Sequence, residues 1–139
     1  MNGKLNILIL ALLAVVAMSS CESRDGFGAE DFDSSSVCLR VKGKMVFEYV
    51  PQSCQIAFNR GRKEFRAGTD TMSDYFLLKL SSIPWEQGQV VSGSLQWTTS
   101  DDMVSLDKLN FKVEDVRDDG KMWLWCSSQK INVVIRLPE

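Results

Sequence analysis

The residue types that usually carry out catalysis are sparse in this sequence. Its 139 residues include no histidine, the commonest general base near neutral pH. Serine and cysteine nucleophiles normally need such a base, so Ser–His–Asp and Cys–His chemistry are excluded. Two acidic pairs, Asp101-Asp102 and Asp118-Asp119, lie in segments rich in turn residues, where aspartate bonds to its own backbone. We therefore expect a protein that is not an enzyme and uses no cofactor.

The cysteines are the second group with potential chemistry. Without histidine or a CxxC spacing a zinc site is not expected, and the acidic turns lack the further oxygen ligands of a calcium loop. No metal site is predicted. In an exported protein, Cys38, Cys54 and Cys126 can form disulfides. A bridge between Cys38 and Cys54 closes the shortest loop and is favoured, while the other pairings and three reduced, buried thiols remain alternatives.

Tryptophans offer a binding surface. Trp123 and Trp125 alternate in KMWLWC, so both point to one face of a strand and Leu124 points to the other. Burial on both sides of a central strand explains this pattern, and the alternative is an aromatic platform that stacks on sugars. Trp97 is expected in the core. Trp85, after a proline in a loop, is the tryptophan expected to be exposed.

A basic cluster is the second feature that suggests binding. Arg60, Arg62, Lys63 and Arg66 surround a predicted hairpin turn and follow Phe58. A solvated hairpin tip is the simplest interpretation. Arginine beside an aromatic ring is, however, typical of interfaces, and the cluster would suit acidic glycans, lipid phosphates or an acidic segment of the chain. The net charge of −2 argues against nucleic acid as a partner.

The elements that hold these residues are strands. After residue 37 apolar residues recur with a period of two, and Asp119-Gly120 between two such runs is a strong hairpin signal. The alternating stretches are 37–49, 54–58, 63–67, 74–80, 89–99, 109–116, 121–126 and 131–137. Seven or eight short strands predict an antiparallel all-β domain over 38–139. We favour a two-sheet sandwich over a small closed barrel.

The first twenty residues have the parts of a secretory signal peptide. Lys4 precedes an apolar run over 7–18 that is shorter than the roughly 20 residues of a spanning helix. Met18-Ser19-Ser20-Cys21 resembles a bacterial lipobox, although the preferred first residue is leucine. The resemblance implies cleavage before Cys21 and acylation of that cysteine, which gives stable anchoring. Ordinary cleavage that leaves Cys21 a thiol is the alternative. Glu22, in place of the aspartate of inner-membrane retention, favours the outer membrane.

The segment from Cys21 to residue 37 is predicted to be a flexible tether. It is acidic, contains three consecutive serines and has little apolar material, a composition typical of extended, solvated linkers. Phe27 and Phe32 are interpreted as isolated aromatics in this linker, with docking on the domain as the alternative.

The strand sequences also resemble a known group of proteins. DYFLLKL, GSLQWTTSDD and DGKMWLWCSSQKINVVI are similar to small cell-envelope lipoproteins of the Bacteroidetes, and the resemblance covers most of 54–137. It implies an envelope location and brings no catalytic residue. We expect a lipid-anchored β domain that binds an envelope protein or a surface ligand. The alternatives are a carbohydrate-binding module that uses Trp85, Trp123 and Trp125, and a purely structural envelope component.

Overall fold

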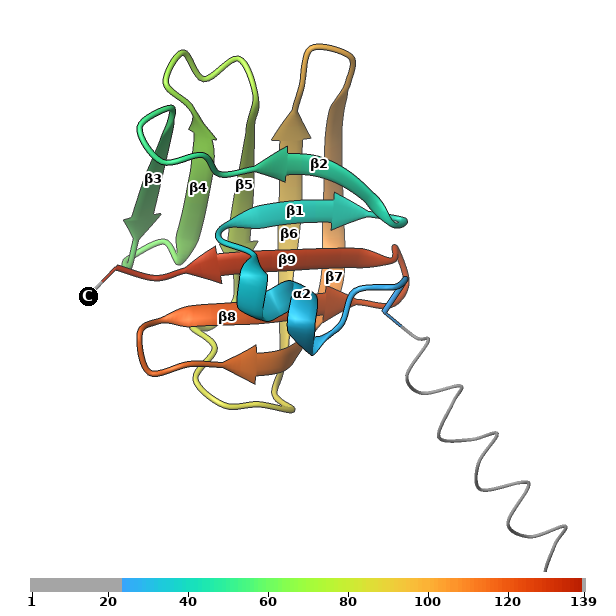
Figure 1. Cartoon of the computed structure of the whole chain (residues 1–139). Helices are drawn as coiled ribbons and strands as arrows, with labels where there is room; N and C mark the ends of the chain where they lie inside the picture. Colours follow the sequence, from blue (N-terminus) through green and yellow to red (C-terminus); the bar gives the residue numbers. More distant parts are fainter. Residues whose placement is uncertain (1–23, 139) are drawn as a thin grey trace, which may run out of the picture.

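The computed structural model describes residues 24–138, which form one antiparallel sheet of nine strands in the order β2-β1-β9-β8-β7-β6-β5-β4-β3 (Figure 1). The predicted all-β, antiparallel class is confirmed. The elements are α2 (Ala29–Ser34), β1 (Cys38–Val41), β2 (Lys44–Glu48), β3 (Cys54–Asn59), β4 (Glu64–Thr69), β5 (Tyr75–Leu80), β6 (Val90–Thr98), β7 (Met103–Val116), β8 (Lys121–Cys126) and β9 (Ile131–Arg136).

The sheet curls until its two ends lie over one another. In Figure 1, β2, β1, β9 and β8 form a front layer that crosses a back layer of β3 to β6, and β7 passes from the back layer into the front one. The register of β7 with β8 shifts between Val113 and Asp115, a bulge of the kind that lets a strand bend. The layers therefore belong to one sheet, so the predicted sandwich of two separate sheets is wrong.

The curl also stops short of the closed barrel considered as the alternative. Strands β2 and β3 are the two ends of the strand order and do not pair with each other, which leaves a half-barrel. Apolar side chains from both layers fill its concave side. Phe47 of β2 meets Phe76 of β5 edge to face, with ring centroids 5.5 Å apart. This contact joins the free end of the front layer to the back layer without any backbone pairing.

A two-residue turn accounts for the ninth strand. Lys42 and Gly43 both have positive φ, 52° and 79°, and Val41 pairs with Lys44. Positive φ at both central residues is the geometry of a type I′ hairpin turn. The alternating stretch 37–49 therefore splits into β1 and β2. The hairpin predicted at Asp119-Gly120 is confirmed, because β7 and β8 pair across it and Gly120 has φ 87°.

The prediction of a solvated tether is wrong for residues 24–37, which we call the N-terminal arm. α2 lies on the outer side of the front layer (Figure 1). Phe32 is fully buried, and with Phe27 it packs on Trp123 and Val134 in a second apolar cluster. The cause is an apolar patch on the outer face of β8 and β9, formed by Trp123 and Val134, which the arm shields from water. Sequence composition alone did not reveal that the two phenylalanines of this segment would pack on the sheet.

The predicted signal peptide and the predicted lipidation site, Cys21, lie outside the described residues. Within residues 24–138, no helix is long and apolar enough to cross a membrane.

Candidate functional site

The predicted basic cluster forms a groove on the outer face of the back layer. Ala57, Arg66 and Leu77 are register partners on β3, β4 and β5, so their side chains share that face. The hairpin turn after β3 closes one side of a groove of about 620 Å³. We call it the arginine groove. It is lined by Ala57, Phe58, Asn59, Arg60, Arg62, Glu64, Arg66 and Leu77. The structure therefore brings Arg60, Arg62 and Arg66 together.

Local contacts hold the turn in place. The side-chain oxygen Oδ1 of Asn59 accepts a hydrogen bond from the backbone N–H of Arg62 at 3.1 Å. Arg60 lies 5.7 Å from the ring centroid of Phe58 and donates from Nη2 to the carbonyl oxygen of Pro138 at 3.2 Å. The turn therefore contacts both its own strand and the C-terminal segment. These contacts fix the backbone that carries the arginines.

The charge of the arginine groove is mainly positive. Glu64 forms an ion pair with Lys79 of the neighbouring strand at 3.3 Å, so a second cation compensates its carboxylate. Among the described residues, no ion pair joins Arg62 or Arg66 to a carboxylate, and both are exposed. A guanidinium offers a planar fork of donors that matches carboxylate, sulfate or phosphate oxygens. The groove is therefore suited to an anionic group.

Sequence reasoning missed the other walls of the groove. Leu77 and Lys79 alternate with buried Phe76 and Leu78 along β5, and this alternation identifies the face they occupy. It does not reveal that Leu77 lies beside Arg66, because the register between β4 and β5 depends on strand pairing across a loop.

The burial favoured for Trp123 and Trp125 is confirmed, and the aromatic platform considered as the alternative is not present. Each of these side chains is only 6% exposed. Trp123 lies under the N-terminal arm, 5.1 Å from Phe27 between ring centroids, and its Nε1 donates to Oδ1 of Asn132 at 2.8 Å. The two tryptophans do face away from buried Leu124, as predicted. The proposed use of these two side chains as an exposed stacking surface is therefore wrong, because the N-terminal arm covers Trp123 and Trp125 is buried.

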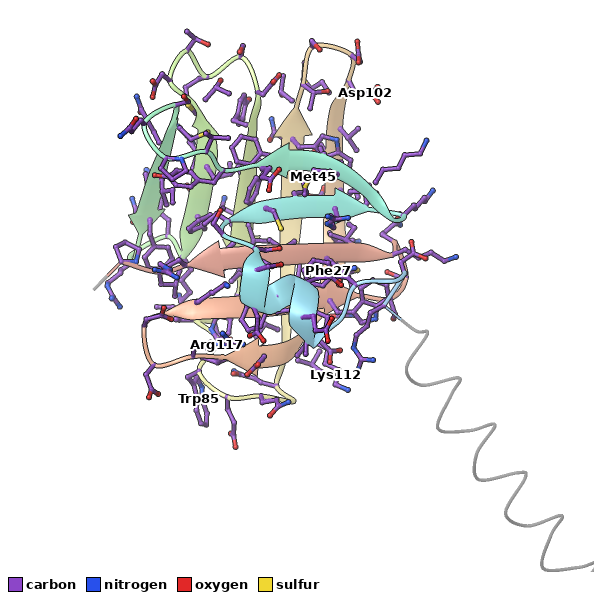
Figure 2. The ribbon with its side chains drawn as sticks, viewed as in Figure 1. Phe27, Met45, Trp85, Asp102, Lys112 and Arg117 are labelled. Atoms are coloured by element: carbon purple, nitrogen blue, oxygen red, sulfur yellow. The ribbon has the colours of Figure 1, made fainter. Side chains whose placement is uncertain are left out.

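The remaining tryptophans agree with the predictions. Trp97 is buried and Trp85 is 71% exposed. Figure 2 shows Trp85 on a loop at the edge of the molecule, directed away from the sheet. Trp125 reaches a separate pocket of about 360 Å³ beside Arg24 and Lys112. Because Trp85 does not line that pocket, the three tryptophans proposed for carbohydrate binding do not form a common surface.

The predicted disulfide between Cys38 and Cys54 is wrong. Cys38, Cys54 and Cys126 are all free thiols. Cys38 belongs to the cluster on the outer face of the sheet, whereas Cys54 and Cys126 belong to the concave core. The sheet itself separates Cys38 from the other two, so their Cβ vectors point apart. Within residues 24–138, no group of three or more Cys, Asp or Glu side chains is placed to hold a metal ion.

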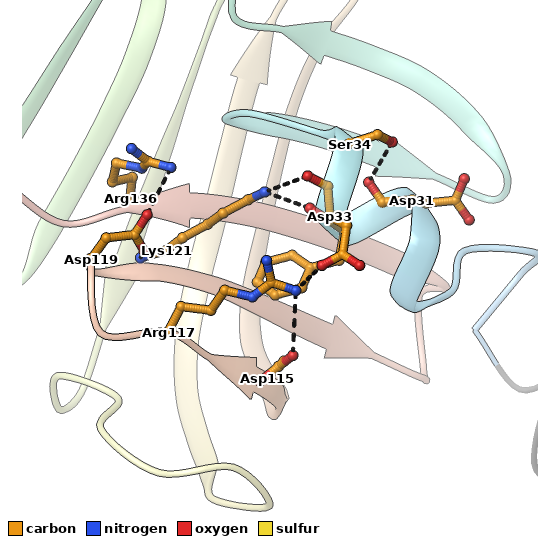
Figure 3. A network of polar contacts seen from close by, with 9 residues as sticks. Asp31, Asp33, Ser34, Asp115, Arg117, Asp119, Lys121 and Arg136 are labelled. Atoms are coloured by element: carbon orange, nitrogen blue, oxygen red, sulfur yellow. Dashed lines mark hydrogen bonds and ion pairs between the residues drawn. The ribbon is translucent and has the colours of Figure 1, made fainter.

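A second polar cluster joins α2 to β8 (Figure 3). The ammonium group of Lys121 donates to the carbonyl oxygens of Phe32 at 2.5 Å and Asp33 at 3.4 Å. Arg117 pairs with Asp33 and lies 4.5 Å from the ring centroid of Phe32. Burial lowers the pKa of Lys121, and the nearby positive charges of Arg117 and Arg136 lower it further. The Lys121 ammonium is already bound to α2, so we assign this cluster to holding the N-terminal arm.

No family model, curated protein or solved structure matches this chain.

Proposed function

We propose that this protein is a non-enzymatic binding domain of the bacterial cell envelope, anchored to a membrane through lipid on Cys21. Its arginine groove binds the anionic groups of a surface ligand or of an envelope protein. The observation that carries the proposal is the groove itself, where Arg60, Arg62 and Arg66 converge and a lysine compensates the one carboxylate. The anchor and the outer-membrane location rest on the lipobox resemblance of residues 18–21.

The groove favours a ligand with carboxylate, sulfate or phosphate groups beside an apolar part. Ala57 and Leu77 lie next to Arg66 on the same face, so apolar contact is available beside the guanidinium group. A carbohydrate module built on tryptophans has less support, because Trp123 and Trp125 are buried beneath other side chains. A purely structural envelope component remains the alternative if no ligand is found.

Binding in the groove can be measured with polyanions of defined chemistry. The full chain is titrated with heparin, which carries sulfates, with polygalacturonate, which carries carboxylates, and with neutral dextran. We expect binding to at least one polyanion and none to dextran. Neutralising two charges by Arg62→Gln with Arg66→Gln is expected to weaken that binding about tenfold or more, which corresponds to about 1.4 kcal/mol. The affinity should also fall as salt rises.

A control with the same change of net charge isolates the groove. Lys108→Gln with Lys112→Gln removes two exposed lysines of β7 that do not line the groove. This pair is expected to retain most of the affinity. Equal losses in both double variants, or no loss in the arginine variant, would contradict groove binding.

The anchor has its own test. Mass spectrometry of the protein extracted from membranes is expected to find an acylated Cys21 as the first residue, and Cys21→Ser is expected to release the protein from membranes. An unacylated residue 21 in the natural product would remove the basis for an envelope location.

A further inference from the structure

The described chain begins on the sheet itself, a short distance from the proposed anchor. The backbone carbonyl of Arg24 accepts a hydrogen bond from Nδ2 of Asn132 at 2.9 Å, and its side chain pairs with Glu114 at 2.8 Å. Only two residues separate Arg24 from Cys21. Three residue steps reach roughly 10 Å even when fully extended. An acyl group on Cys21 therefore confines this end of the domain to the neighbourhood of the membrane surface.

Three lysines gather at the same end. Lys42 lies in the β1–β2 turn, Lys44 is the first residue of β2, and Lys130 precedes β9. The backbone N–H of Lys42 donates to the carbonyl of Lys130 at 2.8 Å, so the two turns are joined. A Cβ on Gly43 would lie 3.8 Å from the carbonyl oxygen of Asp25, which places the tip against the N-terminal arm. We call Lys42, Lys44 and Lys130 the lysine end.

The lysine end carries a net positive charge, because its three lysines outnumber the carboxylate of Asp25, whose Oδ2 would lie 3.9 Å from a Cβ on Gly43. All three side chains are exposed, and no ion pair among the described residues involves them. Some other surface cations do have carboxylate partners, such as Arg136 with Asp119 at 3.1 Å and Lys79 with Glu64, whereas Arg62 and Arg66 of the arginine groove, like the lysine end, have none among the described residues. Positive charge within about a Debye length of a membrane, roughly 8–10 Å, is attracted to anionic headgroups.

The arginine groove belongs to the back layer and lies near the opposite end of β9. β9 runs from Ile131, next to Lys130, to Arg136, and its six residues span about 20 Å. The chain continues to Pro138, whose carbonyl binds Arg60 of the groove. In Figure 1 the C-terminus lies on the side of the molecule away from the start of the N-terminal arm. The two basic regions are therefore separated along the direction of β9.

We propose that the lysine end docks on the membrane, where Lys42, Lys44 and Lys130 bind the phosphates of anionic lipid headgroups. The docked domain has β9 directed away from the bilayer and the arginine groove facing outward. This inference rests on the proposed function, because it requires the anchor at Cys21. It adds an orientation and a lipid-binding surface, and it makes the groove accessible to ligands that approach from solution.

Lysine acetylation on vesicles tests the orientation. The acylated full chain is added to preformed vesicles of phosphatidylcholine alone or with phosphatidylglycerol, and a water-soluble amine reagent is applied. Mass spectrometry then gives the acetylation rate of each lysine. We expect Lys42, Lys44 and Lys130 to react several-fold more slowly on the phosphatidylglycerol vesicles, and high salt to abolish the difference. Lys63, beside the groove, serves as the internal control whose rate stays unchanged.

The outcomes separate this inference from the proposed function. If the protein does not float with either kind of vesicle, the anchor is absent and the proposed function fails. If it floats but the lysine end reacts in step with Lys63, the orientation is wrong while the anchor stands. Docking is also expected to slow hydrogen exchange of the backbone amides near Arg24 at low salt. A variant with Lys42→Gln, Lys44→Gln and Lys130→Gln should float as the natural chain does but lose that protection. Unchanged protection in that variant would also overturn the docking.

Discussion

Single residues on the outer face of the sheet show how burial sets their chemistry. Cys38 is 1% exposed beneath the N-terminal arm. Burial raises the pKa of its thiol above the ordinary value of 9.0, and a hydrogen bond with Ser35 and the charge of Arg40 only partly oppose that effect. Cys54 is less buried than Cys38, and its sulfur accepts a hydrogen bond from the backbone N–H of Val50 at 3.3 Å.

The raised pKa of Cys38 predicts a dependence of stability on pH. Above pH 9.0 the thiol ionises in the unfolded chain while the folded protein keeps its proton. The free energy of unfolding therefore falls as the pH rises from 9.0 towards the raised pKa, by up to about 1.4 kcal/mol per pH unit. Urea denaturation at several pH values should show this decline in the natural chain and a smaller one in Cys38→Ala. Parallel curves for the two proteins would show that Cys38 keeps its ordinary pKa when folded.

Among the elements, the strands were largely predictable and their pairing was not. The bounds of β8, 121–126, agree with the prediction because alternating apolar residues end at the Asp119-Gly120 turn. The β1–β2 turn at Lys42-Gly43 was missed because the alternation continues through it. The arginines of the groove were found as a cluster, since they are close in sequence. Leu77 and Glu64 became part of the same groove only through the register of β3, β4 and β5.

Gly93 in β6 provides a prediction about strand packing. The register with β7 shifts between Gly93 and Leu95, and a Cβ at Gly93 would lie 2.3 Å from the carbonyl oxygen of Lys79. Because that oxygen belongs to the backbone of β5, the strands must separate to admit a methyl group. Gly93→Ala is expected to lower the free energy of unfolding by about 1–3 kcal/mol or more, as measured by urea denaturation.

Gly61 is the matched control for that substitution. A Cβ added at Gly61 would have Oδ1 of Asn59 as its nearest neighbour, at 3.5 Å, an ordinary contact. Gly61→Ala is expected to change stability by less than about 0.5 kcal/mol. Similar losses at both glycines would mean that the close approach of β5 and β6 does not constrain residue 93.

At the scale of the whole molecule, the protein has three layers. The N-terminal arm covers the front layer, and the front layer covers the back layer through the concave core (Figure 1). The outer cluster depends on two phenylalanines of the arm, and Phe32 is fully buried there with its ring centroid 5.9 Å from that of Trp123. The arm is thus part of the folded domain.

Removing the Phe32 side chain should release the arm. Phe32→Ala is expected to lower the free energy of unfolding by about 3–5 kcal/mol, the usual cost for a fully buried phenylalanine. The fluorescence of Trp123 should shift to longer wavelength as water reaches it. Trp85→Ala, at an exposed position, is the control and should have little effect on stability. A Phe32→Ala protein with natural stability and an unshifted spectrum would contradict the packing of the arm.

The sequence by itself determined the antiparallel β class, most strand positions, the burial of Trp97, the exposure of Trp85 and the location of the basic cluster. These properties follow from local alternation and turn chemistry, which neighbouring residues specify. The tertiary structure decided the curl into a half-barrel, the separation of Cys38 from the other thiols, the cover over Trp123 and the walls of the arginine groove. Each depends on contacts between residues far apart in the chain, and a period-two pattern identifies the face of a strand without identifying what packs on it.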